Sequence, residues 1–229
     1  MSVGGLSGAA DEVERAPRKQ VPWGVTALVL LTGIAFVRGG SGDFDSGPPQ
    51  PARAVAPDGS RTSSAAPAPL PYSVPQRVRI PVIRVDAPMT PVGLDADGWV
   101  GAPPPENPNL AGWFTGAVTP GEKGTAVVVG HVDNRTGPAV FYGLGALRKG
   151  SRIEIRRQDG RTAVFGIYGV EVFAKEGFPG DRVYGSKGAP ELRVITCGGG
   201  FSQGIGYDGN VVVFARLTEV RRATATGGR

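Results

Sequence analysis

The chain has 229 residues, of which 37 are glycine and 21 are proline, and its formal net charge at neutral pH is +5. This length suits one domain of ordinary size with additional segments, and so much glycine and proline predicts that part of the chain is not packed. Lysine and arginine are scattered rather than gathered in runs, which argues against nucleic-acid binding and leaves contact with an anionic membrane or cell-wall surface open.

A polar N-terminal segment is followed by an apolar one. Residues 1–20 are predicted to be a cytoplasmic tail with basic residues near its end, and residues 21–37 carry no charge. Such a run is at the short end of what spans a bilayer, about 17–25 residues. Residues 21–38 are therefore predicted to be a transmembrane signal anchor that places the rest of the chain outside the cell. A cleaved signal peptide is the alternative, although residues 36–40 make a poor cleavage site.

A linker and one folded domain are predicted beyond the anchor. Residues 39–75 are rich in Gly, Ser, Pro and Ala, which favours an extended tether. Residues 76–220 form the predicted domain, and residues 221–229 a C-terminal tail. Within the domain, strand-like runs alternate with turn signals at 111–114, 125–132, 151–157, 162–174, 192–197 and 210–218. This pattern predicts an all-β fold, a single closed or nearly closed barrel.

Three local patterns refine this prediction. The residues at 158–160, Gln-Asp-Gly, lie between two strand-like runs and indicate a hairpin. Residues 140–147 are compatible with one short helical turn. The run at 211–215 is apolar without alternation, which predicts a central strand that is buried on both faces.

The only cysteine and the only histidine each end a predicted strand. Cys197 follows the run at 192–196 and precedes three glycines, whereas His131 follows the run at 125–130. A single cysteine excludes an internal disulfide and a zinc site of several cysteines. One thiol and one imidazole are the minimum set for a thiol nucleophile with an acid/base partner. The alternatives are a buried core cysteine and a structural histidine.

The glycines at 198–200 have two interpretations. Acyl transfer through a thiol needs hydrogen-bond donors for the oxyanion of its tetrahedral intermediate, and the backbone N–H groups of these glycines are candidates. A tight turn without a catalytic role explains them equally well. The acyl-thioester is then transferred to water or to an amine, depending on access to the site.

The run Val-Ile-Thr-Cys at 194–197 resembles the nucleophile motif of sortases, the cysteine transpeptidases of Gram-positive cell surfaces. Further blocks resemble, in matching order, the class F branch of high-GC actinobacteria, and together they cover most of residues 76–218. These blocks are 80–81, 92–95, 112–114, 120–124, 128–133, 137–141, 192–199, 207 and 210–213.

The resemblance implies an eight-stranded β-barrel with short helices. It implies that Cys197 is the nucleophile that forms an acyl-enzyme and that His131 is the general acid/base. The expected substrates are surface proteins with a C-terminal Leu-Pro-x-Thr-Gly-like sorting signal, cut between Thr and Gly, and the acceptor is an amine of a peptidoglycan precursor or a pilin. The expected location is the cell membrane, with one span and the catalytic domain outside. No metal or organic cofactor is implied.

One position departs from the family pattern. Sortases carry an arginine between the cysteine and the end of the last strand, but residues 198–215 contain neither Arg nor Lys. The candidates to replace it are Arg216 and Arg193, of which Arg193 shares the face of Cys197 in a regular strand; each is also explained as an ordinary surface residue. Asp208, if it lies close to the thiol, is expected to raise the pKa of the thiol.

The missing arginine keeps an alternative function open. The chain would then be a catalytically impaired sortase-like module that binds a peptide or a wall component. Two other thiol enzymes fit less well. L,D-transpeptidases carry a Ser-His-Gly-Cys arrangement that is absent here, and papain-like proteases place the cysteine before the histidine.

Overall fold

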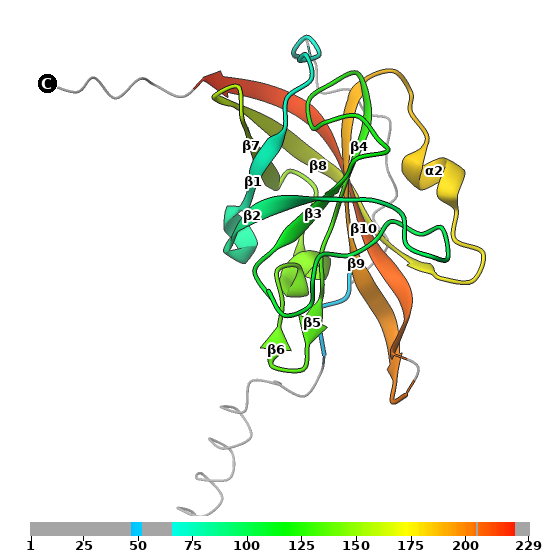
Figure 1. The fold of residues 1–229 in the computed structure, drawn as a ribbon. Coiled ribbons are helices and arrows are strands. Elements are labelled where there is room, and N and C mark those ends of the chain that lie inside the picture. Colours follow the sequence, from blue (N-terminus) through cyan, green and yellow to red (C-terminus); the bar gives the residue numbers. More distant parts are fainter. Residues whose placement is uncertain (1–46, 52–65, 205, 223–229) are drawn as a thin grey trace, which may run out of the picture. The chain divides into compact units, whose positions relative to one another are not determined.

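The structure is a computed structural model that describes residues 47–51, 66–204 and 206–222. Eight of its strands form a barrel: β1 (Pro75–Ile80), β2 (Val85–Val92), β3 (Ala111–Phe114), β4 (Gly124–Val129), β7 (Arg152–Arg157), β8 (Arg161–Ala174), β9 (Pro190–Ser202) and β10 (Gly206–Arg222). They close in the order β1-β2-β3-β4-β9-β10-β8-β7 (Figure 1). The predicted all-β, eight-stranded closed barrel is confirmed.

Short elements lie outside the barrel wall. They are the two-stranded sheet of β5 (Asp133–Asn134) and β6 (Gly137–Pro138), the 3-10 helices η1 (Pro81–Ile83) and η2 (Tyr142–Ala146), and helix α2 (Gly180–Tyr184). The predicted helical turn within 140–147 is present as η2. The predicted hairpin is also present, since β7 pairs with β8 and Gly160, with φ of 75°, donates its N–H to the carbonyl of Arg157 at 3.2 Å.

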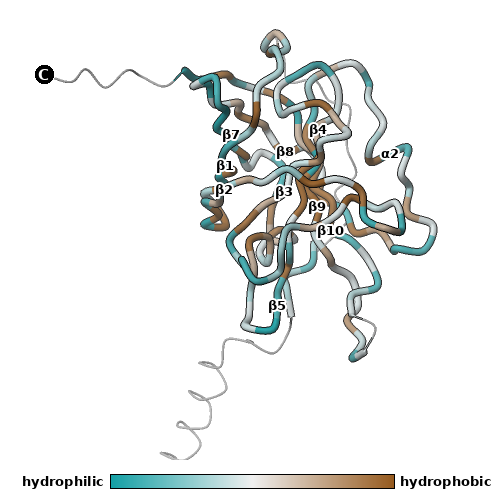
Figure 2. Tube along the Cα trace, in the orientation of Figure 1, coloured by the Kyte–Doolittle hydropathy of each residue, from teal (hydrophilic) through white to brown (hydrophobic). Residues whose placement is uncertain are grey.

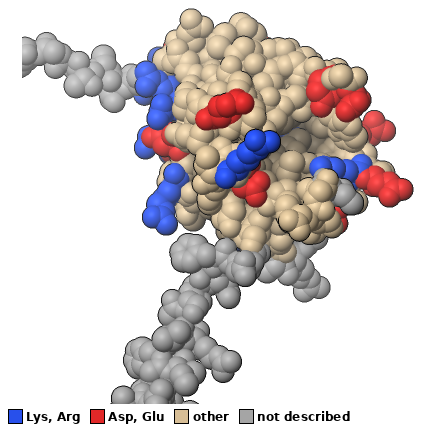
Figure 3. All heavy atoms as spheres, turned by 60° about the horizontal axis from the view of Figure 1, so that its bottom comes forward, with Lys and Arg blue, Asp and Glu red and all other residues tan. Residues whose placement is uncertain are grey.

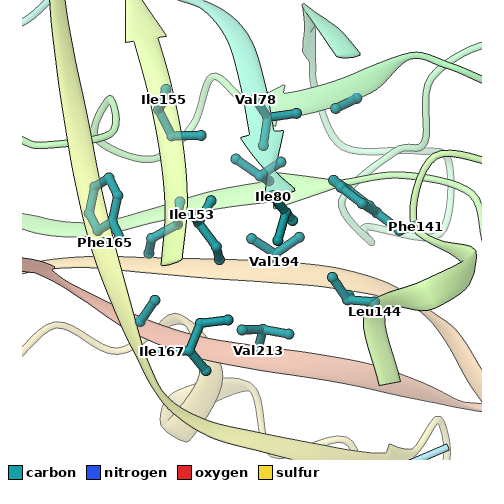
Figure 4. Packing of buried hydrophobic residues seen from close by; sticks show 14 of the residues in the cluster. Val78, Ile80, Phe141, Leu144, Ile153, Ile155, Phe165, Ile167, Val194 and Val213 are labelled. Atoms are coloured by element: carbon teal, nitrogen blue, oxygen red, sulfur yellow. The ribbon is translucent and has the colours of Figure 1, made fainter. Parts of the chain in front are cut away.

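Apolar side chains from every barrel strand fill the interior (Figure 4). Val78, Ile153 and Phe165 are fully buried there, and burying one such side chain stabilises the fold by roughly 1.5–3 kcal/mol. Figure 2 shows the same distribution along the chain, with hydrophobic segments on the central strands and hydrophilic ones in the outer loops.

The outer face of β4, β9 and β10 carries a second apolar cluster, which contains Val129, Ile195, Val212 and Phe214. Strand β10 contributes to both clusters, because Val211 and Val213 belong to the interior and Val212 and Phe214 to the outer cluster. The prediction of a central strand that is buried on both faces is therefore confirmed. The outer cluster forms the floor of the candidate site.

Strand β9 does not end at Cys197, and the predicted strand end there is wrong. The strand continues through the glycines to Ser202 and stays paired with β10. The register shifts where Gly209 pairs with Gly198 while Tyr207 pairs with Phe201, which leaves extra β9 residues opposite Asp208. Gly199 in this bulge has φ of 87°, a backbone conformation that glycine adopts without a steric penalty.

Part of the predicted tether contacts the barrel. Leu70 donates its N–H to the carbonyl of Gly121 at 2.8 Å, and the fully buried Arg157 donates to the carbonyl of Pro71 at 2.5 Å. Within the described ranges, no helix combines the length and the hydropathy needed to cross a membrane. The predicted tail at 1–20 and anchor at 21–38 lie outside the described residues.

Candidate active site

Cys197 lies on the outer face of β9, where it pairs with Asn210 of β10. Its thiol is partly exposed. It lines a pocket of about 370 Å³, called here the thiol pocket. The described residues that line this pocket are Asp95, Trp99, Val100, Val129, Lys175, Phe178, Tyr184, Ile195, Cys197 and Asn210. The thiol is therefore accessible from a cavity rather than sealed in the core.

His131 lies two residues beyond the end of β4, the strand that pairs with β9. Strand β4 runs parallel to β9, with Val129 opposite Ile195 as the last pair. The connection continues past the strand, because the N–H of Gly130 donates to the carbonyl of Ile195 at 3.2 Å and Thr196 Oγ1 donates to the carbonyl of Gly130 at 2.8 Å. Extrapolating this register by two residues pairs position 131 with position 197, but the strand pairing itself ends at Val129. Of the described residues that line the thiol pocket, none is a histidine.

The imidazole of His131 is held by a backbone carbonyl. Its Nε2 lies 2.7 Å from the oxygen of Pro103. Because a carbonyl oxygen only accepts hydrogen bonds, Nε2 carries a proton and Nδ1 is the nitrogen left to exchange one. Between the side chains of His131 and Cys197 themselves, the structure shows no hydrogen bond. Cys197 lies on β9 and His131 follows the adjacent strand β4, and the catalytic roles of both stay predictions.

Burial and two charged side chains set the acidity of the thiol. Burial raises the pKa of Cys197, the ammonium of Lys175 lowers this pKa, and the carboxylate of Asp133 raises it. Asp133 also accepts a hydrogen bond of 2.5 Å from the hydroxyl of Tyr207. Burial and this hydrogen bond raise the pKa of Tyr207. Residue-by-residue reasoning on the sequence missed both Lys175 and Asp133.

The polar groups around the glycines are already engaged. Gly199 donates its N–H to Oε1 of Gln50 at 3.2 Å, and Gly200 donates its N–H to Oδ1 of Asp208 at 2.7 Å. Asp208 therefore holds the bulge, and the acidic group that raises the pKa of Cys197 is Asp133. The proposed oxyanion role of the glycine N–H groups stays a prediction, since both donors have partners within the chain in this conformation.

The two candidate arginines line a different cavity. Arg193 is 3% exposed and donates to the carbonyl of Val183 at 3.0 Å and to the carboxylate of Glu191 at 2.5 Å. Arg216 pairs with Glu191 across β9 and β10 and lies over the ring of Tyr168. Both line a pocket of about 450 Å³, called here the arginine pocket.

Arg193 shares the outer face with Cys197, as strand alternation predicts, because it stacks on Phe214 of the outer cluster. Four residues of strand nevertheless separate the two positions, which is about 13 Å at 3.3 Å per residue. Of the described residues that line the thiol pocket, none is an arginine. The structure thus brings neither arginine to the thiol.

A larger cavity adjoins the thiol pocket. It measures about 890 Å³ and shares Trp99, Val100, Phe178 and Tyr184 with the thiol pocket, so that the two form one groove. The ring of Phe178 contacts those of Trp99 and Tyr184, each with centroids 5.9 Å apart. This groove offers an apolar, aromatic surface that leads to the cysteine.

Charged groups are sparse on the face shown in Figure 3, where acidic and basic side chains are interspersed. Among the described residues, no group of three or more His, Cys, Asp or Glu side chains is arranged to hold a metal ion. The thiol pocket itself presents the thiol of Cys197 and the ammonium group of Lys175.

Comparison with known proteins assigns the family. Residues 78–218 match the model of the sortase domain, and the chain belongs to the sortase family. This family consists of cysteine transpeptidases that act on sorting signals. No curated protein sequence matches the chain.

Several solved sortase structures share the fold. A sortase from Actinomyces oris is 19% identical, with 72% of this chain and 92% of that chain covered and a TM-score of 0.52. A lid mutant of sortase A from Corynebacterium diphtheriae is 18% identical, with 66% and 73% covered and a TM-score of 0.50. Sortase C1 of pilus island 1 from GBS is 20% identical, with 67% and 68% covered and a TM-score of 0.50. At these identities the similarity shows the fold alone.

Proposed function

We propose that this chain is an active, membrane-anchored sortase of the class F type. It cleaves a Leu-Pro-x-Thr-Gly-like sorting signal outside the cell and transfers the acyl group to an amine. The observation that carries this proposal is the partly exposed thiol of Cys197 in a pocket that adjoins an aromatic groove. His131 follows β4, the strand that pairs with β9. The sequence blocks support class F, and the apolar run at 21–38 supports the anchor.

The reaction proceeds in two halves. The thiolate of Cys197 attacks the carbonyl carbon of the Thr-Gly bond, and the carbonyl electron pair moves to oxygen. As this intermediate collapses, the C–N bond breaks and the leaving amine takes a proton from the imidazolium of His131. The acceptor amine then attacks the thioester, gives a proton to the imidazole and releases the thiolate.

The groove suggests how the sorting signal binds. Its aromatic walls, formed by Trp99, Phe178 and Tyr184, suit the apolar Leu-Pro part of the signal. The Thr carbonyl would then lie at Cys197. The acceptor is an amine of a peptidoglycan precursor or of a pilin lysine, which reaches the thioester from solvent.

A direct test incubates the full-length chain with a Leu-Pro-x-Thr-Gly peptide and an amine acceptor. We expect an acyl adduct on Cys197 by mass spectrometry and a peptide–amine product. Cys197→Ala should abolish both and leave the circular dichroism spectrum unchanged, because the side chain is small and only partly buried. Product formation by the Ala variant would remove Cys197 as the nucleophile, and fractionation of cells would test the anchor.

A binding module without turnover is the second candidate. It is favoured by the lack of an arginine among the described residues of the thiol pocket and by the effect of burial, which raises the pKa of Cys197. In that case the wild-type chain would bind the peptide without forming an adduct. Cys197→Ala would then bind it equally well.

A further inference from the structure

We propose that Lys175 is the catalytic cation of the thiol pocket. Its ammonium favours the Cys197 thiolate and then donates to the oxyanion that forms when the thiolate attacks. This role rests on the transpeptidase function proposed above. Four observations support it: the place of Lys175 in the sheet, the residues that line the pocket, the lack of an acidic partner, and the charge that acts on the thiol.

The sheet positions Lys175 next to the reacting sulfur. Phe173, Asn210 and Cys197 form one row across β8, β10 and β9, because Asn210 pairs with both of the others. Lys175 comes two residues after Phe173, so strand alternation directs its side chain to the same face as the thiol. Its backbone N–H donates to the carbonyl of Asp208 at 2.9 Å, which fixes the chain just past the end of β8.

The lining of the pocket singles out this lysine. Of the described residues that line the thiol pocket, Lys175 is the one with a cationic side chain, and Arg193 and Arg216 line the arginine pocket instead. The electrostatic effect agrees with the geometry, since the charge of Lys175 lowers the pKa of Cys197 against the opposing effects of burial and Asp133.

The ammonium is available for a substrate. Lys175 is exposed, and within the described part of the chain no carboxylate lies close enough to form an ion pair with it. Asp95, the acidic residue of the pocket lining, accepts N–H groups of its own loop through Oδ1, from Asp97 at 3.0 Å and Trp99 at 2.9 Å. A lysine carries its charge on a flexible four-carbon stem and can therefore follow an oxygen that changes geometry during the reaction.

The chemistry requires such a group at this point. Attack of the thiolate moves negative charge from sulfur to the substrate oxygen, and fixed donors near that oxygen lower the barrier. The backbone N–H groups of Gly199 and Gly200 are occupied by Gln50 and Asp208. Lys175 supplies the charge, and the amide of Asn210, which pairs with Cys197, is placed to add a neutral hydrogen bond.

Three variants of the full-length chain test the role. Lys175→Met removes the charge and keeps the length, Lys175→Arg keeps the charge, and Lys187→Met is the matched control because Lys187 is an exposed lysine of the arginine pocket. Because Cys197 is the only cysteine, its rate of alkylation by iodoacetamide reports the thiolate directly. The pH profile of that rate and the kcat/KM for peptide transfer are the two readouts. The other titratable groups around the thiol pocket are unchanged in all three variants: His131, Asp133, Asp95, Tyr184 and Tyr207.

We expect Lys175→Met to shift the alkylation profile to higher pH and to lower kcat/KM by about 10²-fold, as for the loss of one oxyanion donor. Lys175→Arg should restore most of both, and Lys187→Met should match the wild type. If Lys175→Met matches the control in either readout, the proposal is overturned. If the wild-type chain transfers no peptide, the proposed function fails, and the alkylation profiles alone then decide whether Lys175 acts on the thiol.

Discussion

The thiol pocket and the arginine pocket share the outer face of β9 and β10, but they use their charges differently. In the arginine pocket, Arg193 is buried against Glu191 and stacked on Phe214. In the thiol pocket, the exposed Lys175 has no acidic partner among the described residues, and its charge lowers the pKa of Cys197. Counting the cationic side chains that line a pocket therefore does not identify the one that can act on a substrate.

The difference follows from what each charge is bound to. A buried guanidinium that satisfies a carboxylate and a carbonyl contributes to the fold, and its field is largely neutralised by its partner. An exposed ammonium without a partner contributes little to stability and acts on whatever group enters the pocket. The thiol pocket should therefore respond to substitution through reactivity, and the arginine pocket through stability.

The largest effect that separates the pockets is expected from His131→Ala. If His131 is the acid/base, kcat/KM for peptide transfer should fall by ~10²–10⁴, because the leaving amine loses its proton donor. The urea midpoint should change little, since the imidazole is partly exposed and its one hydrogen bond is to the carbonyl of Pro103. If His131→Ala loses stability but keeps its rate of peptide transfer, His131 has a structural role rather than a catalytic one.

The arginine pocket should give the opposite result. Arg193→Met removes the guanidinium that pairs with the carboxylate of Glu191, which is 12% exposed, and leaves that carboxylate its hydrogen bond with Tyr168. The free energy of unfolding should fall by at most about 3–5 kcal/mol, the usual loss for a broken buried ion pair. The alkylation profile of Cys197 should stay in place because the arginine is about 13 Å away along the strand. Urea unfolding and iodoacetamide rates measure the two quantities.

The double variant Arg193→Met with Glu191→Leu controls for the unpaired charge. It should recover most of the lost stability, because an apolar pair often replaces a buried ion pair at little cost. A shift in the pH profile of Cys197 alkylation in Arg193→Met would contradict the separation of the two pockets. It would mean that Arg193 also acts on the thiol.

Much of the fold was predictable because strand signals are local. Hydrophobic runs, the Asp-Gly turn and the apolar stretch at 211–215 each depend on neighbours in the sequence. The end of β9 was not predictable from local signals, because glycines usually stop a strand. Here they continue it as a bulge that pairs with Tyr207 and Gly209. Pairing with another strand outweighs the local preference.

The site was predictable only in part, for a related reason. Cys197 and His131 were singled out because each is the single residue of its type, and their roles stay predictions. Strand alternation also gave the correct face for Arg193, but sharing a face with Cys197 did not bring the arginine close to the thiol. Lys175 comes to the thiol through the strand order β8-β10-β9, and no pattern within one strand reveals that order. Asp133 follows His131 by two residues, so proximity in sequence was the available signal.

The smallest expected effect concerns Asp133 and sharpens the account of the thiol pocket. The carboxylate of Asp133 raises the pKa of Cys197, so Asp133→Asn should lower this pKa and move the alkylation profile to lower pH. At a pH below the pKa the thiolate fraction then rises, and alkylation should quicken by a few-fold at most, because burial still opposes ionisation. The asparagine carbonyl can still accept a hydrogen bond from the hydroxyl of Tyr207, which keeps the local contact.

Tyr207→Phe is the matched control, since it removes that hydroxyl and keeps the carboxylate of Asp133. It should not move the alkylation profile to lower pH. A downward shift in both variants would mean that the hydrogen bond, rather than the charge of Asp133, controls the thiol.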